Sequence, residues 1–320
     1  MILSVTVNPC VDHAMFVRSL ALHDTNRVVR TEIDAGGKGI NLSRVAAEVG
    51  GHSVATGFLG GGTGNFVLGV LKREGIEADF IHIDGETRTN FSIEDDSGNP
   101  PTTFNEPGAE VSPEIWENLK NHLEKYKNKA SWLTIGGSLP PGMSPSAYRE
   151  LVEIGHRLGA KVLLDADNDA LSEGLKAGPD FIKPNKDEAE RLLGRSITTD
   201  EEVLQAVRDL ASELSPRAMT MISLGKDGAV LATPEGLFKG TSPQVEARST
   251  IGSGDSLLGA FLAALERTQD VSESFRWGLA AGAATATTDG TEIARLDKIK
   301  DLMNLVKIQQ IFDRTEPEKS

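Results

Sequence analysis

The sequence is short of several features that whole classes of protein require. Its single cysteine, Cys10, excludes a disulfide within the chain, and its 6 histidines are scattered without the spacing of metal ligands. No apolar run reaches the length of a membrane span, and no secretory signal is visible. Cations are also scarce, because 33 Lys and Arg stand against 47 Asp and Glu, a formal net charge of −14. We therefore expect a cytoplasmic protein that binds neither nucleic acid nor membranes.

Two common nucleotide-binding loops are missing as well. The pattern Gly-x-x-x-x-Gly-Lys-Ser/Thr occurs nowhere, and neither does a strand-linked Gly-x-Gly-x-x-Gly. Glycine itself is abundant, with 33 residues in a chain of 320 that is 39% hydrophobic. Such a chain can bury one large α/β core or two smaller ones, and we expect one main domain with a small appendage. Any nucleotide must be bound by another scaffold.

The most informative segment is Ser-Thr-Ile-Gly-Ser-Gly-Asp-Ser-Leu-Leu-Gly-Ala-Phe-Leu at 249–262. The glycines of its turn can direct N–H groups towards an anion, and apolar residues then recur at helical spacing. The turn is therefore predicted to open a helix whose positive dipole end points at the same place. Asp255 can take a proton from a hydroxyl there, while Gly252, Ser253 and Gly254 stabilise a transferring phosphoryl group. The alternative is that Asp255 only caps the helix.

A second glycine turn, Asp-Ala-Gly-Gly-Lys-Gly-Ile-Asn at 34–41, also leads into a predicted helix. Both turns, with other motifs between them, resemble the PfkB family of carbohydrate kinases, which has the ribokinase-like fold. The resemblance covers nearly the whole chain, and the motifs stand in the order of that family. Ser253 replaces an alanine found in many members, and serine fits the same turn. The other motifs are Gly-Ser-Leu-Pro-Pro-Gly at 137–142, Lys-Pro-Asn-Lys-Asp-Glu at 183–188 and Ser-Leu-Gly-Lys-Asp-Gly at 223–228.

Within the family, the chain most resembles the phosphosugar branch of 1-phosphofructokinase, the minor 6-phosphofructokinase and tagatose-6-phosphate kinase. The resemblance implies transfer of the γ-phosphate of ATP, with Mg²⁺, to a free hydroxyl of a hexose monophosphate. Segment 104–111 is most similar to 1-phosphofructokinases and favours fructose 1-phosphate, while fructose 6-phosphate and tagatose 6-phosphate stay open. A non-catalytic sugar-phosphate sensor on a kinase fold is the alternative of another class, and the retention of Asp255 argues against it. The marks of the branch are Thr-Val-Asn-Pro at 6–9, Asp12, Lys38 and Thr-Arg-Thr-Asn at 87–90.

Apolar runs of strand length alternate with helix-like segments along most of the chain. The alternation predicts an α/β fold with a doubly wound parallel sheet flanked by helices, in which ligands collect beyond the carboxyl ends of the strands. Polar motif residues follow several of these strands, and we therefore expect them to share one cleft. The predicted strands are 2–7, 54–59, 132–135, 161–165, 181–183, 218–223 and 229–233.

Two segments, 12–35 and 86–105, break this alternation and are predicted to form strands of a small separate sheet. The resemblance implies a β lid that closes over the sugar and pairs with the lid of a second subunit, giving a homodimer. The alternative is a surface hairpin that does not move. The main domain is then expected to comprise 1–11, 36–85 and 106–312, followed by a flexible tail at 313–320.

The phosphate already present on the sugar needs cations, and Lys38, Arg88 and Arg27 are the candidates. A planar guanidinium can bind a phosphate bidentately. The resemblance places Arg88 on the sugar phosphate with Lys38 and Ser138 beside it, and Asp12 and Asn41 on the sugar hydroxyls. Arg27, on an expected strand, has the alternative of a solvated surface residue, and Asp12 that of a cap on the turn after Pro9. The full predicted substrate-binding set is Asp12, Gly37, Lys38, Asn41, Arg88, Asn90, Ser138 and Arg27.

The nucleotide is expected on the other side of the same cleft. The segment 223–228 follows a predicted strand, and its two glycines let the backbone run close to ATP. The Asn-x-x-Glu pattern of the family is met by Asn185 and Glu188, which would organise waters around Mg²⁺ or, alternatively, form only a capping box. Adenine is expected against small side chains of 280–287. The predicted nucleotide-binding residues are Lys183, Asn185, Ser223, Gly225 and Gly228.

Overall fold

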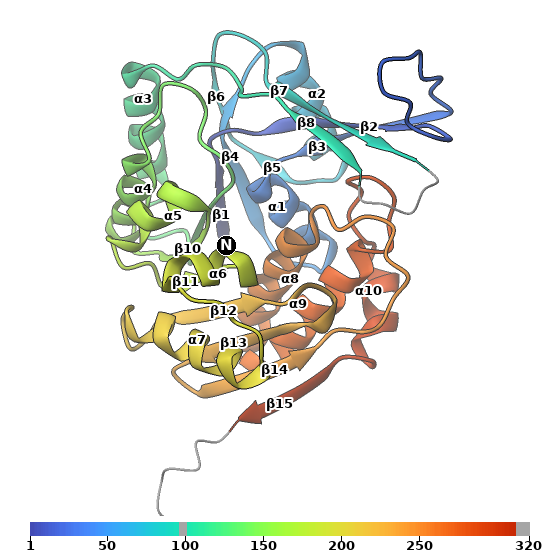
Figure 1. Ribbon diagram of the computed structural model, residues 1–320. Coiled ribbons are helices and arrows are strands. Elements are labelled where there is room, and N and C mark those ends of the chain that lie inside the picture. The colour runs from blue at the N-terminus through green and yellow to red at the C-terminus, as the bar shows by residue number, and fades with distance from the viewer. Residues whose placement is uncertain (96–100, 312–320) are drawn as a thin grey trace, which may run out of the picture.

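A computed structural model of the protein describes residues 1–95 and 101–311. The tail predicted at 313–320 lies outside these residues. The described chain forms a large α/β domain and a small sheet that projects from it (Figure 1). The predicted α/β class, with a small separate sheet, is confirmed.

The large sheet has 11 strands, and every strand predicted from the sequence is present in it. Strands β1, β4, β9, β10, β11 and β12 pair in parallel, as the alternation of elements predicted. From one edge to the other the strands are β15 (Lys307–Ile311), β14 (Gly236–Thr241), β13 (Ala229–Thr233), β12 (Met219–Ser223), β11 (Phe181–Ile182), β10 (Lys161–Asp165), β9 (Trp132–Gly136), β1 (Ile2–Thr6), β4 (Ser53–Leu59) and β5 (Glu77–Ala78), and β6 (Ile81–His82) also pairs with β4.

One end of this sheet departs from the predicted parallel arrangement. Strand β13 pairs antiparallel with β12, β14 with β13, and β15 with β14. Only Pro234 and Glu235 link β13 to β14, and so short a link cannot hold the crossover helix that a parallel pair requires. The predicted parallel direction was therefore wrong for strand 229–233, while the rest of the predicted strands pair in parallel.

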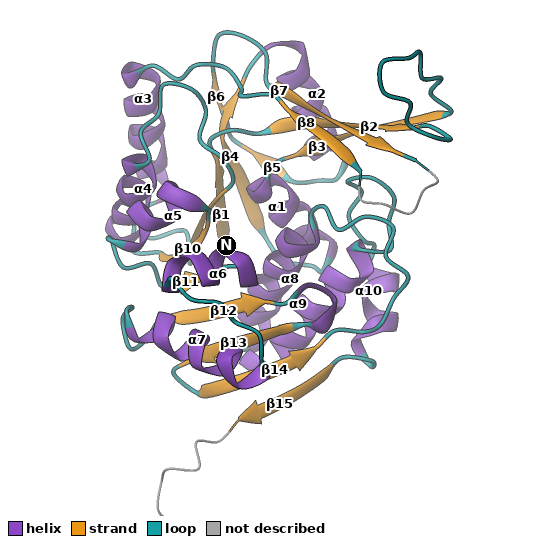
Figure 2. Ribbon diagram, viewed as in Figure 1, coloured by secondary structure: helices purple, strands orange, loops and turns teal. Residues whose placement is uncertain are grey.

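Helices cover both faces of the large sheet (Figure 2). Along β1, Ile2 belongs to one buried core and Leu3 to the other, as the two-residue period of a strand requires. Among the described residues, no helix combines the length and apolarity needed to cross a bilayer. The Ile2 face carries α1 (Lys38–Glu48), α8 (Ser253–Thr268), α9 (Val271–Thr285) and α10 (Leu296–Met303); the Leu3 face carries α3 (Pro113–Leu123), α4 (Ser146–Arg157), α5 (Asn168–Leu175), α6 (Lys186–Leu193) and α7 (Asp200–Ser212).

The small sheet has 4 strands in the order β3 (Arg30–Gly36), β2 (Cys10–Phe16), β7 (Arg88–Glu94) and β8 (Thr102–Asn105). Its first hairpin reaches slightly further than the predicted 12–35, because Cys10 pairs with Gly36. Together with α2 (Gly61–Arg73), it packs on a third apolar cluster that includes Val11 and Ala35. The sheet therefore lies next to the start of α1, since β3 ends at Gly36 and α1 begins at Lys38.

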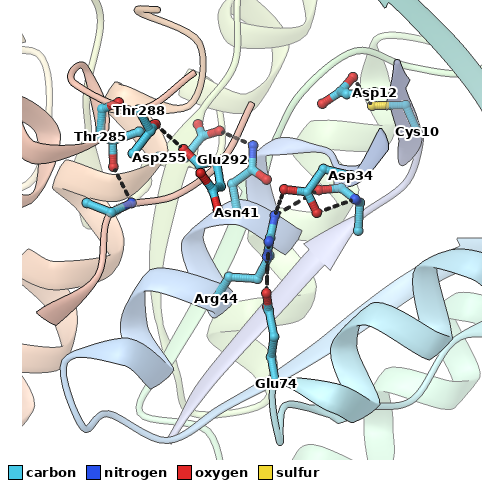
Figure 3. Close-up of polar contacts among 12 residues, drawn as sticks. Cys10, Asp12, Asp34, Asn41, Arg44, Glu74, Asp255, Thr285, Thr288 and Glu292 are labelled. Carbon is cyan, nitrogen blue, oxygen red and sulfur yellow. Dashed lines mark hydrogen bonds and ion pairs between the residues drawn. The ribbon is translucent and has the colours of Figure 1, made fainter. Parts of the chain in front are cut away.

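A buried arginine ties this sheet to the large domain (Figure 3). Arg44 of α1 forms ion pairs with Asp34 of β3 at 3.0 Å and with Glu74 after α2 at 2.8 Å. Because Arg44 is buried, both carboxylates compensate a charge that would otherwise be costly to remove from water. Loss of either partner would loosen the base of the small sheet.

Candidate active site

Helices α1 and α8 cross so closely that the two glycine turns meet at one point. A Cβ atom on Gly259 of α8 would lie 2.4 Å from the carbonyl oxygen of Leu42 in α1, so only glycine fits there. Gly37 and Gly252 begin these helices with φ of +118° and +73°, which favour glycine. As a result, Asn41 Nδ2 lies 2.9 Å from Asp255 Oδ2 (Figure 3).

Asp255 is a buried carboxylate, 8% exposed, in the first turn of α8. The N-cap position belongs to Gly252, and the carboxylate instead accepts a hydrogen bond from Asn41, so Asp255 is not the helix cap. Burial raises the pKa of Asp255 to about 6; nearby Lys38 acts in the opposite direction, and Asp165 adds to the rise. A carboxylate with this pKa is ionised at neutral pH and still able to accept a proton.

A first cavity of about 590 Å³ opens in front of Asp255, between the large domain and the small sheet. Arg27 lies outside it, in the exposed loop between β2 and β3 rather than on the strand expected from the sequence. All other predicted substrate-binding residues line this cavity together with Gly252 and Asp255, namely Asp12, Gly37, Lys38, Asn41, Arg88, Asn90 and Ser138.

The small sheet supplies part of the cavity wall that sequence reasoning missed. These side chains belong to strands whose pairing brings them level with Asp12 and Asn90. No motif marks them, because only the pairing of the strands brings them to the cavity. They are His13, Phe91, Ser92, Thr103 and Asn105.

Polar atoms with no partner point to a ligand rich in hydroxyl groups. Asp12 Oδ1 accepts from Cys10 Sγ at 3.2 Å and from Asn90 Nδ2 at 3.1 Å, so Asp12 does not cap the turn after Pro9. Among the described residues, no group donates to the buried Oδ1 atoms of Asn41 and Asn90. Because buried acceptors are normally satisfied, these atoms are suited to receive hydroxyl groups of a bound molecule.

Asp165 holds two lysines at the centre of the site. Its Oδ1 lies 3.2 Å from Lys38 Nζ and 3.3 Å from Lys183 Nζ. Burial opposes its ionisation, but the two lysines hold the pKa of Asp165 below its usual range. Sequence reasoning placed Asp165 at a strand end without a role, since its contact with both lysines depends on the order of β9, β10 and β11.

A second cavity of about 490 Å³ lies on the other side of the 252–254 turn. Ser253 and Gly254 line it, whereas Gly252 and Asp255 line the first, so the turn separates the two spaces. Every residue predicted to bind nucleotide lines this second cavity, namely Lys183, Asn185, Ser223, Gly225 and Gly228.

The second cavity also has an apolar wall of small side chains. Gly282, Ala283 and Ala286, from the region expected to meet adenine, line it with Leu279. The facing wall comes from the loop at 242–247, which sequence analysis did not identify. That loop carries no motif, and only its position after β14 brings it to the cavity.

Asn185 and Glu188 form the capping box that was the alternative to a metal-binding role. Asn185 Oδ1 accepts from the Glu188 N–H at 2.8 Å, and Glu188 Oε2 accepts from the Asn185 N–H at 2.8 Å. Within residues 1–95 and 101–311, no three His, Cys, Asp or Glu side chains converge as a metal-binding group. A metal cage made of protein side chains therefore does not fit this part of the chain.

Comparisons with known proteins agree with this geometry. The model of the pfkB family of carbohydrate kinases matches residues 5–298. Curated relatives of near-full coverage are named 1-phosphofructokinase, and the one from Borreliella burgdorferi is 31% identical over 313 residues, covering 98% of this chain and 99% of the relative. The structure of phosphofructokinase-2 from Escherichia coli in complex with substrates and products has a TM-score of 0.89 at 27% identity, covering 95% of this chain and 98% of that one.

A ribokinase from Giardia lamblia aligns with a TM-score of 0.74 over 95% of this chain and 98% of its own. At 20% identity this likeness shows the fold alone. The expected ribokinase-like fold is thereby confirmed.

Proposed function

We propose, because the chain belongs to the PfkB family of carbohydrate kinases, that it phosphorylates fructose 1-phosphate to fructose 1,6-bisphosphate. The broader activity, an ATP-dependent kinase of hexose phosphates, follows from the family and from the 1-phosphofructokinase relatives. The observation that carries the mechanism is the position of Asp255 and the 252–254 turn between two cavities. One cavity suits the sugar phosphate and the other suits ATP.

The acceptor hydroxyl of the sugar would meet Asp255 in the first cavity. Asn41 holds Asp255 Oδ2, which leaves Oδ1 to take the proton of that hydroxyl. The hydroxyl oxygen then forms its bond to the γ-phosphorus of ATP while the bond from that phosphorus to the leaving ADP oxygen breaks. A buried carboxylate with a pKa of about 6 suits this proton transfer at neutral pH.

Negative charge on the transferring phosphoryl group would be stabilised from three directions. The N–H groups of the 252–254 turn lie at the positive end of the α8 dipole. Lys183, held by Asp165, lies on the nucleotide side. Mg²⁺ bound to ATP would neutralise phosphate charge. Glu188 Oε1, which the capping box does not use, and Asn185 Oδ1, which can accept a second hydrogen bond, would hold its waters, in keeping with a site that lacks a protein cage among the described residues.

The choice of fructose 1-phosphate rests on the names of the curated relatives and on the likeness of segment 104–111 to that group. Arg88, Lys38 and Ser138 in the first cavity would bind the phosphate already on the sugar. An unphosphorylated sugar would leave these cations without an anion. Fructose 6-phosphate differs from fructose 1-phosphate only in the position of the phosphate, and tagatose 6-phosphate differs also in the orientation of one hydroxyl.

The small sheet would act as a lid and as a dimer interface. Ile33, His13, Phe91 and Phe104 stand in one row across its strands and therefore share a face. His13 and Phe91 line the first cavity, while Ile33 and Phe104 at the two edges are 51% and 56% exposed. The same sheet of a second subunit would cover these apolar edges, and an Arg27 contact with substrate would require such an arrangement.

Replacement of the base tests the mechanism most simply. Asp255→Asn keeps the shape of the side chain but cannot take the proton, so kcat should fall by about 10³-fold or more while the KM for sugar phosphate changes little. Steady-state kinetics with ATP and fructose 1-phosphate measure both. Asp167→Asn, in a residue that lines the same cavity, is the control and should keep near-parental kcat. A kcat of Asp255→Asn within tenfold of the parent would remove Asp255 from the role of base.

A further inference from the structure

Asn8 lies just after β1 and contacts the three segments that carry Arg88, Pro107 and Ser138. Its side chain is 7% exposed. Its Nδ2 donates to Ser138 Oγ at 3.1 Å and to the Pro107 carbonyl at 3.0 Å. The backbone carbonyl of Asn8 accepts from Arg88 Nε at 3.3 Å. One residue thus connects two of the three predicted phosphate ligands.

The contact with Pro107 fixes which way the Asn8 amide faces. A carbonyl oxygen can only accept, so the Asn8 atom that faces the Pro107 carbonyl must be the amide nitrogen. The same nitrogen then donates to Ser138 Oγ, which acts as an acceptor in this bond. A serine hydroxyl has a single hydrogen, and that hydrogen remains available for an anion in the cavity.

The backbone carbonyl of Asn8 orients the Arg88 side chain. Arg88 Nε is held by Asn8, and Nη1 donates to the Glu106 carbonyl at 3.0 Å. A Cβ atom on Gly108, where φ is +96°, would lie 2.3 Å from Asn8 Oδ1, so the 106–108 segment packs tightly against Asn8. These contacts fix the plane of the guanidinium and leave the Nη2 hydrogens to donate to a phosphate.

We infer that Asn8 is the positioning residue of the sugar-phosphate subsite. Its side-chain amide makes the Ser138 hydroxyl a donor, and its backbone carbonyl orients the Arg88 guanidinium. The inference rests on the proposed function, because it requires Ser138 and Arg88 to contact the substrate phosphate. Asn8 lines the first cavity, and its hydrogen bonds go to Pro107, Ser138 and Arg88 and not to Asp255 or the 252–254 turn. Its effect should therefore fall on binding of the phosphosugar and not on ATP or on the chemical step.

A double-mutant cycle tests this inference. Asn8→Ala removes the donor to Ser138, so we expect the KM for fructose 1-phosphate to rise about tenfold, with kcat and the KM for ATP within about twofold of the parent. In a Ser138→Ala background the same change should raise that KM by less than about threefold, since the hydroxyl that Asn8 orients is gone. Asn8→Asp, of similar volume, should raise the KM more than Asn8→Ala, because its carboxylate would take the Ser138 hydrogen for itself.

The outcomes separate this inference from the proposed function. Equal effects of Asn8→Ala in the two backgrounds, or parallel rises in the KM for ATP and for sugar phosphate, would overturn the positioning role. Ser138→Ala and Arg88→Ala report on the subsite itself. If neither raises the KM for the sugar phosphate, the proposed function loses its phosphate site whatever Asn8 does. Thermal unfolding verifies that each variant is folded, and Asn8→Asp carries the test if Asn8→Ala does not fold.

Discussion

At the scale of single residues, the environment of Asp255 predicts a pH dependence of activity. Burial raises its pKa from the ordinary 3.8 to about 6, so below that pH the base is protonated and kcat should fall. The phosphates of the substrates also titrate near this range. Because Lys38 lowers the Asp255 pKa, Lys38→Met should move the midpoint of the kcat profile to higher pH. An unchanged midpoint would assign the profile to another group.

The same shift has a consequence for stability. Between the ordinary pKa of 3.8 and about 6, the folded chain binds a proton that the unfolded chain has lost. The contribution of Asp255 to stability therefore falls as the pH rises through that window. The Asp255→Asn variant avoids this cost, so its melting temperature above pH 6 should equal or exceed that of the parent. A marked decrease would show that ionised Asp255 does not destabilise the folded chain.

Residues within motifs could be placed from the sequence, and residues that depend on register could not. Lys38, Asn41 and Asp255 stand in glycine turns whose geometry explains their positions. The role of Asp165 depends on its contacts with two lysines on other segments, and the role of Asn8 depends on its contacts with Ser138 and Arg88. Such contacts join residues that lie between 18 and 130 positions apart in the sequence, and local patterns do not encode them.

At the scale of elements, strands could be predicted where apolar runs lie between turns. The direction of β13 and β14 could not be read from hydrophobicity, because parallel and antiparallel strands share the same two-residue period. Strands β5, β6, β14 and β15 of the large sheet were missed altogether. In β15, Lys-Ile-Gln-Gln-Ile is a half-exposed edge strand with little apolar character. The small sheet was recognised by its break from the alternation, and its register with the cavity appeared only in three dimensions.

The apolar edges of the small sheet predict its role in assembly. Ile33→Lys combined with Phe104→Lys places charges on the face proposed as the dimer interface, so the double variant should sediment as a monomer where the parent sediments as a dimer. Leu305→Lys is the matched control, because Leu305 is equally exposed, at 58%, but lies on the large domain. A parent that sediments as a monomer at all concentrations, or a double variant that stays dimeric, would contradict the interface.

At the scale of the whole molecule, an acidic chain gathers cations where two anionic substrates would meet. The net charge is −14, yet Lys38, Lys183 and Arg88 all line the two cavities. Lys183 follows the carboxyl end of β11 and Lys38 begins α1, as a doubly wound fold predicts for ligand-binding residues, whereas Arg88 begins β7 of the small sheet. The turn of α8 between the cavities is where the two substrates would react.

The most direct test of the central claim is ADP release by purified protein with Mg²⁺ and ATP against a set of acceptors. The set is fructose 1-phosphate, fructose 6-phosphate, tagatose 6-phosphate and free fructose. We predict a preference for fructose 1-phosphate of about a hundredfold in kcat/KM, or ~2.7 kcal/mol of transition-state discrimination. A preference for a 6-phosphate would overturn the proposed substrate, and no turnover with any acceptor would contradict the kinase mechanism and favour a sugar-phosphate sensor.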